Sequence, residues 1–256
     1  MEAAMTTSTT LAADVRLNEL TVALQPVLDL RTGKVHGFEA LLRGPAGSDV
    51  NPPAMFRRAR RERWLGELED RARSLAFEAA ERYLQSEEVL FLNGDIRYPL
   101  PPHRYPHIVM EVSEAQNVSH HQVEKLRKQG LKLYLDDYGV SHGNLARILD
   151  IRPCGIKVDR TIVRGISEDR RRFAIARALA SLASDLGMEL VAEGIETSED
   201  LVAARRAGFE LGQGYYLGRP LPRPDRDEIG RVGQLLSNMV IERVTSARFR
   251  LVASNL

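Results

Sequence analysis

Strand-like and helical segments alternate along this chain from Val22 to Gln213, and this regularity constrains the fold more than any other feature. The first two apolar segments, Val22–Leu30 and Val35–Leu42, are joined by a short connection that contains Gly33. A connection of this length predicts a hairpin of antiparallel strands. Beyond the hairpin, the alternation of strands with helices is typical of a parallel α/β sheet.

Six further strands and at least five helices are expected after the hairpin. The strands are Val89–Leu92, Ile108–Glu114, Leu131–Asp137, Gly155–Asp159, Met188–Gly194 and Phe209–Gln213. The helices are Ala54–Gln85 (as one helix or two), Val118–Gln129, Gly143–Asp150, Glu168–Leu186 and Ser198–Arg206. Eight strands favour a closed barrel over an open sheet, and such a barrel carries its active site at the carboxyl ends of the strands.

Seven successive strands each carry an exceptional polar residue within them or at their exit. These residues are Glu39, Asn93, Glu111, Asp136 with Asp137, Lys157, Glu193 and Gln213. Nearly all of them offer oxygen atoms, and hard oxygen ligands select Mg²⁺, Mn²⁺ or Ca²⁺. The pattern therefore predicts a site for divalent cations where the strands end.

Simpler roles exist for single members of this set. Asp136 and Asp137 can both stay ionised if a cation lies between them, but either could instead cap the following helix. Glu39 lies among apolar residues, where an unpaired carboxylate is costly, and a core ion pair with Arg43 is an alternative to a metal site. It is the succession of seven strands that favours the metal site.

The composition excludes several classes of protein. Lys and Arg number 36 against 35 acidic residues, a net charge of +1 that argues against bulk binding of nucleic-acid polymers. Cys154 is the only cysteine, so we expect neither an internal disulfide nor a cysteine-built metal site, and a reducing, cytoplasmic location. No apolar run approaches the roughly 18 residues of a membrane span.

The flanks of the alternating region carry weaker patterns. We expect residues 1–16 to be a disordered lead-in, 17–237 to form the barrel domain, and 238–256 to be an extension whose role the sequence does not specify. The Arg57–Arg63 segment is dense in arginine, which indicates a solvated helix face or a docking surface for a protein partner.

An ordered set of motifs resembles the EAL-domain family, the phosphodiesterases that hydrolyse the bacterial second messenger cyclic di-GMP. The motifs are Gln25-Pro26, Phe38 to Arg43 with Glu39-Ala40-Leu41, Leu92-Asn93, Glu111-Val112-Ser113-Glu114, Asp136-Asp137-Tyr138-Gly139, Ile156 to Asp159, Ala192 to Glu196, and Gln213-Gly214-Tyr215. The resemblance spans Leu20 to Pro222. It implies a modified TIM (β/α)8 barrel whose first strand is antiparallel, which agrees with the hairpin.

The resemblance also implies roles for individual residues. Glu39, Asn93, Glu111 and Asp136 would bind one Mg²⁺ or Mn²⁺, and Asp136 and Asp137 would share a second. Lys157 would contact the attacking water, and Glu193 would orient a water on the metal; with Glu39 they form the expected catalytic set. Gln25, Arg43 and Gln213 would contact cyclic di-GMP, and Glu114 would support the loop after the paired aspartates. The expected product is linear pGpG, and the expected assembly is a homodimer.

Two departures from the family pattern bear on activity. The family usually reads Phe-Gly-Thr-Gly-Tyr-Ser-Ser-Leu after the paired aspartates, whereas this chain continues Tyr138-Gly139 with Val140 to Asn144. This loop positions the second metal and is linked to dimer contacts in the family, so its change leaves open a catalytically weak domain that senses cyclic di-GMP or binds a protein. Gly44 stands where the family commonly has Trp, a change expected to weaken packing near the substrate without altering the chemistry.

Overall fold

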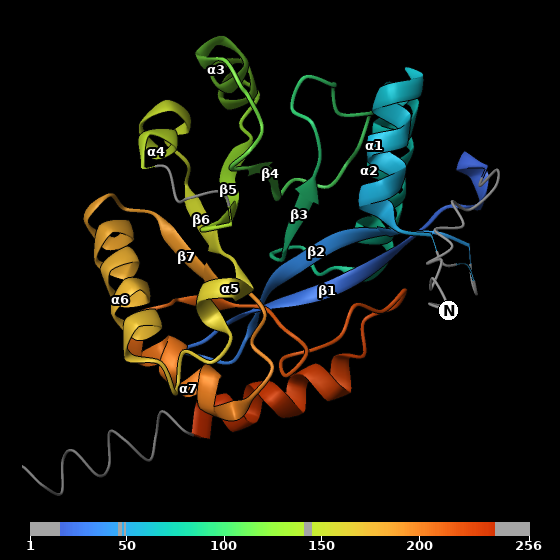
Figure 1. Ribbon diagram of the computed structural model, residues 1–256. Coiled ribbons are helices and arrows are strands. Elements are labelled where there is room, and N and C mark those ends of the chain that lie inside the picture. Colours follow the sequence, from blue (N-terminus) through green and yellow to red (C-terminus); the bar gives the residue numbers. More distant parts are fainter. Residues whose placement is uncertain (1–15, 46–47, 49, 141–144, 239–256) are drawn as a thin grey trace, which may run out of the picture.

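The computed structural model describes residues 16–45, 48, 50–140 and 145–238 as one closed barrel with helices around it (Figure 1). The expected lead-in, the C-terminal extension after 238 and most of the altered loop lie outside the described residues. The strands are β1 (Thr21–Asp29), β2 (Val35–Arg43), β3 (Val89–Asn93), β4 (Ile108–Ser113), β5 (Lys132–Tyr138), β6 (Gly155–Val158), β7 (Glu189–Ala192) and β8 (Leu211–Gly212). The helices are η1 (Leu17–Glu19), α1 (Pro52–Glu62), α2 (Leu65–Tyr83), α3 (His120–Lys128), α4 (Ala146–Ile151), α5 (Arg160–Val163), α6 (Arg170–Asp185) and α7 (Ser198–Ala207).

The strands follow one another around the barrel in chain order, from β1 to β8. β1 is antiparallel to both of its neighbours, β2 and β8, and every other neighbouring pair is parallel. The predicted hairpin and the antiparallel first strand are therefore confirmed. This arrangement brings the carboxyl ends of seven strands to one mouth, together with the amino end of β1.

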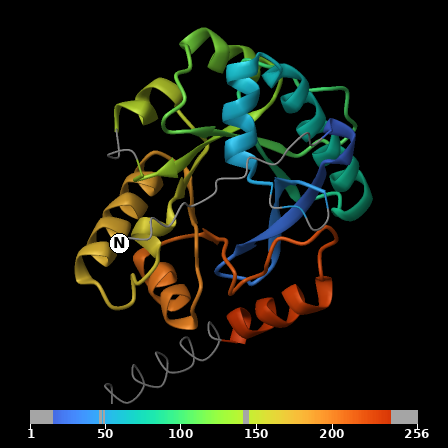
Figure 2. The same ribbon diagram turned by 45° about the vertical axis from the view of Figure 1, so that its right-hand side comes forward.

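The helices form a ring outside the strands (Figure 2). The segment expected as one helix or two forms α1 and α2, which Arg63 separates by adopting a left-handed conformation (φ 68°). The short helix α5 was not expected. Residues 226–238 are also helical and pack against the barrel, where the Arg226 guanidinium lies 4.8 Å from the centre of the Phe38 ring. None of the helices in the described part of the chain has the length and apolar character needed to cross a bilayer.

A small apolar layer fills the half of the barrel interior that is farther from the mouth. Its buried members are Val27, Phe91, Val109, Tyr134, Val191 and Leu211. On β6 the layer position is a glycine, because a Cβ on Gly155 would lie 2.5 Å from the Tyr134 ring. The Tyr134 hydroxyl donates to Glu189 at the far end of the barrel from the mouth. We call this apolar layer the floor; the polar residues of the mouth lie directly above it.

Candidate active site

The polar residues of the mouth form the next layer above the floor. Side chains two residues apart on a strand point the same way. Asn93, Glu111, Asp136, Glu193 and Gln213 follow the floor residues Phe91, Val109, Tyr134, Val191 and Leu211 by two positions. Gln25 precedes Val27 by two positions, because β1 runs in the opposite direction. Strand alternation thus produces an apolar floor and a polar ring above it.

Lys157 lies at the centre of this ring and is 1% exposed. Its Nζ atom is 2.7 Å from Glu193 Oε1, 2.8 Å from Glu111 Oε1, 3.1 Å from Glu39 Oε2 and 3.4 Å from Asp136 Oδ1. Four strands therefore deliver four carboxylates to one ammonium group. The structure brings Glu39, Glu111 and Asp136 together around this atom, three of the four residues that the resemblance assigns to one cation.

Glu39 accepts hydrogen bonds from three side chains. Asn93 Nδ2 donates to its Oε1 at 2.5 Å, while Lys157 and Gln213 donate to its Oε2 at 3.1 and 2.7 Å. Gln213 Nε2 also donates to Gln25 Oε1 at 3.1 Å. The ion-pair partner of Glu39 is thus Lys157 rather than Arg43, whose Nη1 donates to the carbonyl of Leu42.

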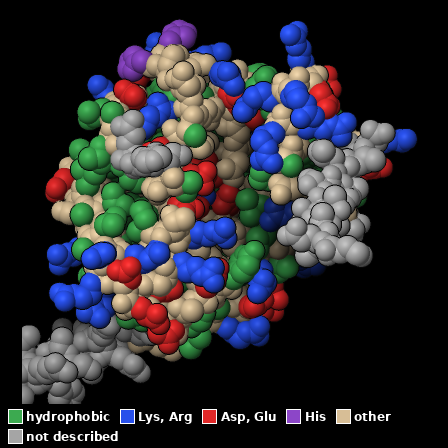
Figure 3. Space-filling view, viewed as in Figure 1, with side chains coloured by type: hydrophobic (Ala, Val, Ile, Leu, Met, Phe, Trp, Pro, Cys, Tyr) green, Lys and Arg blue, Asp and Glu red, His purple; other side chains and the backbone are tan. Residues whose placement is uncertain are grey.

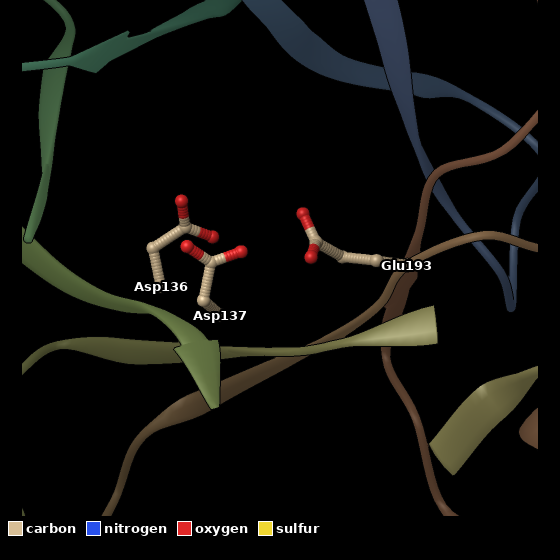
Figure 4. A group of neighbouring side chains, drawn as sticks. All are labelled: Asp136, Asp137 and Glu193. Carbon is tan, nitrogen blue, oxygen red and sulfur yellow. The ribbon is translucent and has the colours of Figure 1, made fainter. Parts of the chain in front are cut away.

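The end of β5 breaks strand alternation. Asp137 has a left-handed backbone (φ 56°), and the pairing of β5 with β6 shifts register between Leu135 and Tyr138. Regular alternation would turn the side chain of Asp137 away from the mouth. In this irregular turn the carboxylates of Asp136 and Asp137 instead lie side by side and face Glu193 across the mouth (Figure 4). Ligand oxygens of these three residues lie within 4.8 Å of one another, an arrangement able to hold a metal ion.

The charges in the ring are unbalanced. Burial and the neighbouring carboxylates raise the pKa of Asp137 to about 6 and that of Glu193 to about 8, even though Lys157 opposes both shifts. The same causes raise the pKa of Glu111 well above its usual range. For Glu39, burial is outweighed by Lys157 and by the hydrogen bonds from Gln213 and Asn93, so its pKa is lowered. One ammonium group does not neutralise this many carboxylates.

The donor set of the ring fits hard divalent cations. Both carboxylate oxygens of Glu111 and Oδ1 of Asp136 are buried and accept no hydrogen bond within the described part of the chain, although Lys157 lies near both groups. Buried oxygens of this kind are normally satisfied. Five carboxylates and one amide offer the oxygen ligands that Mg²⁺, Mn²⁺ and Ca²⁺ take. Additional positive charge would satisfy the orphaned oxygens and offset the surplus of negative charge.

Two cavities open from the ring. The larger, of about 420 Å³, is lined by Glu39, Asn93, Asp136, Asp137, Lys157 and Glu193, and it extends past Arg43 to Phe56 on α1 and Arg73 on α2. The smaller, of about 190 Å³, lies beside Gln25 and Gln213. Figure 3 shows acidic side chains in a hollow of this face, with lysine and arginine side chains around it.

Glu114 lies just outside the ring, next to the end of β5. It is 6% exposed, its backbone N–H donates to the carbonyl of Asp136 at 3.0 Å, and its Oε2 accepts a 3.4 Å hydrogen bond from the N–H of Gly139. These contacts connect β4 with the turn that carries the paired aspartates. Neither aspartate caps the next helix: both belong to β5, and α4 begins after Leu145 without a side-chain cap.

Several residues around the ring were not singled out from the sequence. Asp159, Arg160, Glu196 and Tyr215 line the smaller cavity. Asp159, Glu196 and Tyr215 belong to motifs named in the sequence analysis, and membership of these motifs was the only sequence signal for them. The hydrogen bond of Gln213 to Glu39 was also unexpected, because these residues are far apart in the sequence.

The EAL domain is the family model that matches this chain, over residues 96–220. The cyclic di-GMP phosphodiesterase NbdA of Pseudomonas aeruginosa is 29% identical over 241 residues, which cover 85% of this chain and 31% of the relative. The chain is thus similar in sequence to proteins of the EAL-domain family. This result confirms the resemblance found in the sequence.

Solved structures of EAL proteins share the fold. The calcium and cyclic di-GMP complex of BlrP1 from Klebsiella pneumoniae has a TM-score of 0.71 at 27% identity, covering 82% of this chain and 58% of that one. A manganese and cyclic di-GMP complex of the same protein gives a TM-score of 0.69 at 28% identity, covering 79% of this chain and 56% of that one. The chain spans less than half the length of two curated relatives, NbdA of P. aeruginosa and PdeN of Escherichia coli, at 31% and 45% of their residues.

Proposed function

We propose that this protein hydrolyses cyclic di-GMP to linear pGpG with the aid of two divalent cations. The observation that supports this most strongly is the ring itself: carboxylates from four strands converge on one buried lysine. The relatives named as cyclic di-GMP phosphodiesterases and the BlrP1 complexes with cyclic di-GMP support the choice of substrate.

In this proposal Glu39, Asn93, Glu111 and Asp136 hold one cation, and Asp136 and Asp137 share the second. The BlrP1 complexes contain calcium or manganese, and Mg²⁺ or Mn²⁺ is the proposed cofactor here. When bound, two such cations polarise a phosphate and make water a better nucleophile near neutral pH.

The chain's own residues bind and orient the reactants. Lys157 Nζ, buried among carboxylates, keeps its proton because the surrounding charges raise its pKa well above the usual value, despite the opposing effect of burial. It therefore acts as a hydrogen-bond donor to the attacking water. Glu193 accepts a hydrogen bond from a second water and orients it. Arg43 offers guanidinium donors to phosphate oxygens, and Gln25 and Gln213 offer amide groups to the rest of the substrate.

Chromatography of the reaction products tests this proposal. Purified protein incubated with cyclic di-GMP and Mg²⁺ or Mn²⁺ should release pGpG. Glu39→Ala should lower turnover by at least about a thousandfold, because it removes a proposed ligand together with the carboxylate that accepts hydrogen bonds from Asn93, Gln213 and Lys157. Glu78→Ala, on the exposed face of α2, is the matched control and should leave turnover unchanged. Tight binding of cyclic di-GMP by the wild-type protein, with no product in either cation, would instead support the sensor role.

We further propose a homodimer that acts in the cytoplasm. Val140 begins the altered loop, and Leu145 and Leu149 follow it; they are 55%, 56% and 74% exposed, a degree of apolar exposure that a second copy would reduce. Measurement of the mass in solution, with and without Leu149→Glu, tests the dimer. We also propose the Arg57–Arg63 segment as a contact for a protein partner. The proposed phosphodiesterase domain comprises residues 17–237.

A further inference from the structure

A buried ion pair on α2 lies directly behind the ring. Glu69 and Arg73 are one helical turn apart and are 2% and 1% exposed. Arg73 Nη2 lies 3.1 Å from Glu69 Oε2. A buried ion pair contributes little net stability compared with a well-packed apolar pair, because desolvation offsets the attraction between the charges. The contacts of the pair indicate a role beyond stability.

Both side chains hold the backbone of the segment that follows β3. Arg73 Nη1 donates to the carbonyls of Tyr98 and Pro99 at 2.7 and 2.9 Å, and Nη2 donates to the carbonyl of Asp95 at 2.8 Å. Glu69 Oε1 accepts the N–H of Asp95 at 2.9 Å. The pair thus binds both backbone groups of Asp95, two residues after Asn93.

Gly94, between Asn93 and Asp95, is packed directly against the pair. Its φ is 149°, and a Cβ there would lie 2.5 Å from Glu69 Oε2 and 2.9 Å from Arg73 Nη2. The two charged groups therefore determine how the backbone turns as β3 ends. Asn93, the last residue of β3, directly precedes this turn.

The segment is also tied to the loop after β4. The Asp95 carboxylate accepts hydrogen bonds from Arg97 Nε at 2.8 Å and from Gln116 Nε2 at 3.1 Å. Gln116 follows β4, the strand that carries Glu111. The hydrogen bond between Gln116 and Asp95 thus connects the ends of β3 and β4, two adjacent strands that carry proposed metal ligands. Glu69 and Arg73 contact the β3 side of this connection.

We propose that the Glu69–Arg73 pair positions the amide of Asn93 and thereby sets the affinity of the site for its cation. Glu69 and Arg73 are positioning residues, and this inference rests on the proposed role of Asn93 as a ligand. The amide donates through Nδ2 to Glu39, which leaves its Oδ1 to serve as the ligand atom. A guanidinium that binds three carbonyls fixes that orientation, whereas a lysine ammonium has neither the planar fork nor the reach to bind all three.

Mn²⁺ binding to the apoprotein, measured by isothermal titration calorimetry, tests the proposal without relying on turnover. Arg73→Lys keeps the charge balance and should raise the dissociation constant by about tenfold. Glu69→Leu combined with Arg73→Met removes both charges and should raise it further, toward about a hundredfold. Glu78→Gln, on the exposed face of the same helix, should change nothing.

Further measurements distinguish a loss of positioning from a loss of folding, and test separately whether Asn93 is a metal ligand. Thermal unfolding in EDTA reports stability alone; if the double variant does not fold, Arg73→Lys decides the question. Asn93→Ala should weaken Mn²⁺ binding, and adding Arg73→Lys to it should cause little further loss, because both changes act on the same amide. Mn²⁺ affinity within twofold of wild type in the folded Arg73→Lys protein would overturn the proposal. Unchanged affinity in Asn93→Ala would instead refute the ligand assignment of the proposed function.

Discussion

At the scale of the residue, Asp137 combines an unusual backbone with a charge that its surroundings disfavour. Its φ of 56° is tolerated by Asp and Asn and costs most other residues about 1–2 kcal/mol. Burial and the charge of Asp136 raise its pKa to about 6, so its ionised form is strained electrostatically as well. The conformation is what brings the second carboxylate to the mouth.

The two contributions of Asp137 can be measured separately. In EDTA at pH 7, Asp137→Asn should be at least as stable as the wild type, because it keeps the left-handed backbone and removes the repulsion from Asp136. Asp137→Ala should be less stable than Asp137→Asn by about 1 kcal/mol in urea unfolding. Equal stability of the two variants would show that the backbone of Asp137 is not strained. Both variants should lose affinity for the second cation.

At the scale of the element, the strands of the barrel were predictable and the irregular turn of β5 was not. Alternation predicted the strands and placed the polar residues within them or at their exits, and the short connection at Gly33 predicted the hairpin, because these patterns are local. Glu69 and Arg73 give no such signal: spaced four residues apart on a helix, they have the spacing of an ordinary surface pair. Their burial depends on the segment from Asp95 to Pro99, which lies far along the chain. The left-handed conformation of Asp137 likewise accompanies a shift of register between β5 and β6, and β6 lies farther along the chain.

The barrel floor gives a prediction about packing between β5 and β6. A Cβ on Gly155 would lie 2.5 Å from the Tyr134 ring, so Gly155→Ala should lower the free energy of unfolding by about 1–3 kcal/mol. Tyr134→Leu removes the obstructing ring and should itself be destabilising, since it leaves a cavity. The double variant should be less destabilised than the sum of the two single variants.

Chemical denaturation of the four proteins in this cycle measures the coupling. Strict additivity would show that the glycine is not required by the ring. Gly230→Ala is the control: no atom lies within 4 Å of the added Cβ, and the residue is helical, so this change should raise stability by about 0.5–1 kcal/mol.

At the scale of the whole molecule, a net charge of +1 conceals a strong separation of charge. The ring gathers five carboxylates around Lys157, while the arginines of the Arg57–Arg63 segment lie on and just after α1. In the absence of cations, part of the stability of the fold therefore depends on protons that stay bound to the ring.

The metal-free protein should consequently become less stable as the pH rises from 6.5 to 8. The folded-state pKa of Glu193 is about 8, against an ordinary value of 4.5, so across this window the folded state holds a proton that the unfolded state has lost. Stability must then fall as the pH rises, by about 1 kcal/mol per pH unit. Urea unfolding in EDTA measures the slope, and Glu193→Gln should reduce it, because an amide does not titrate. Saturating Mn²⁺ should reverse the trend, since the cation competes with protons for the same oxygens and binds more tightly at higher pH. A metal-free stability that rises between pH 6.5 and 8 would show that the ring does not retain these protons.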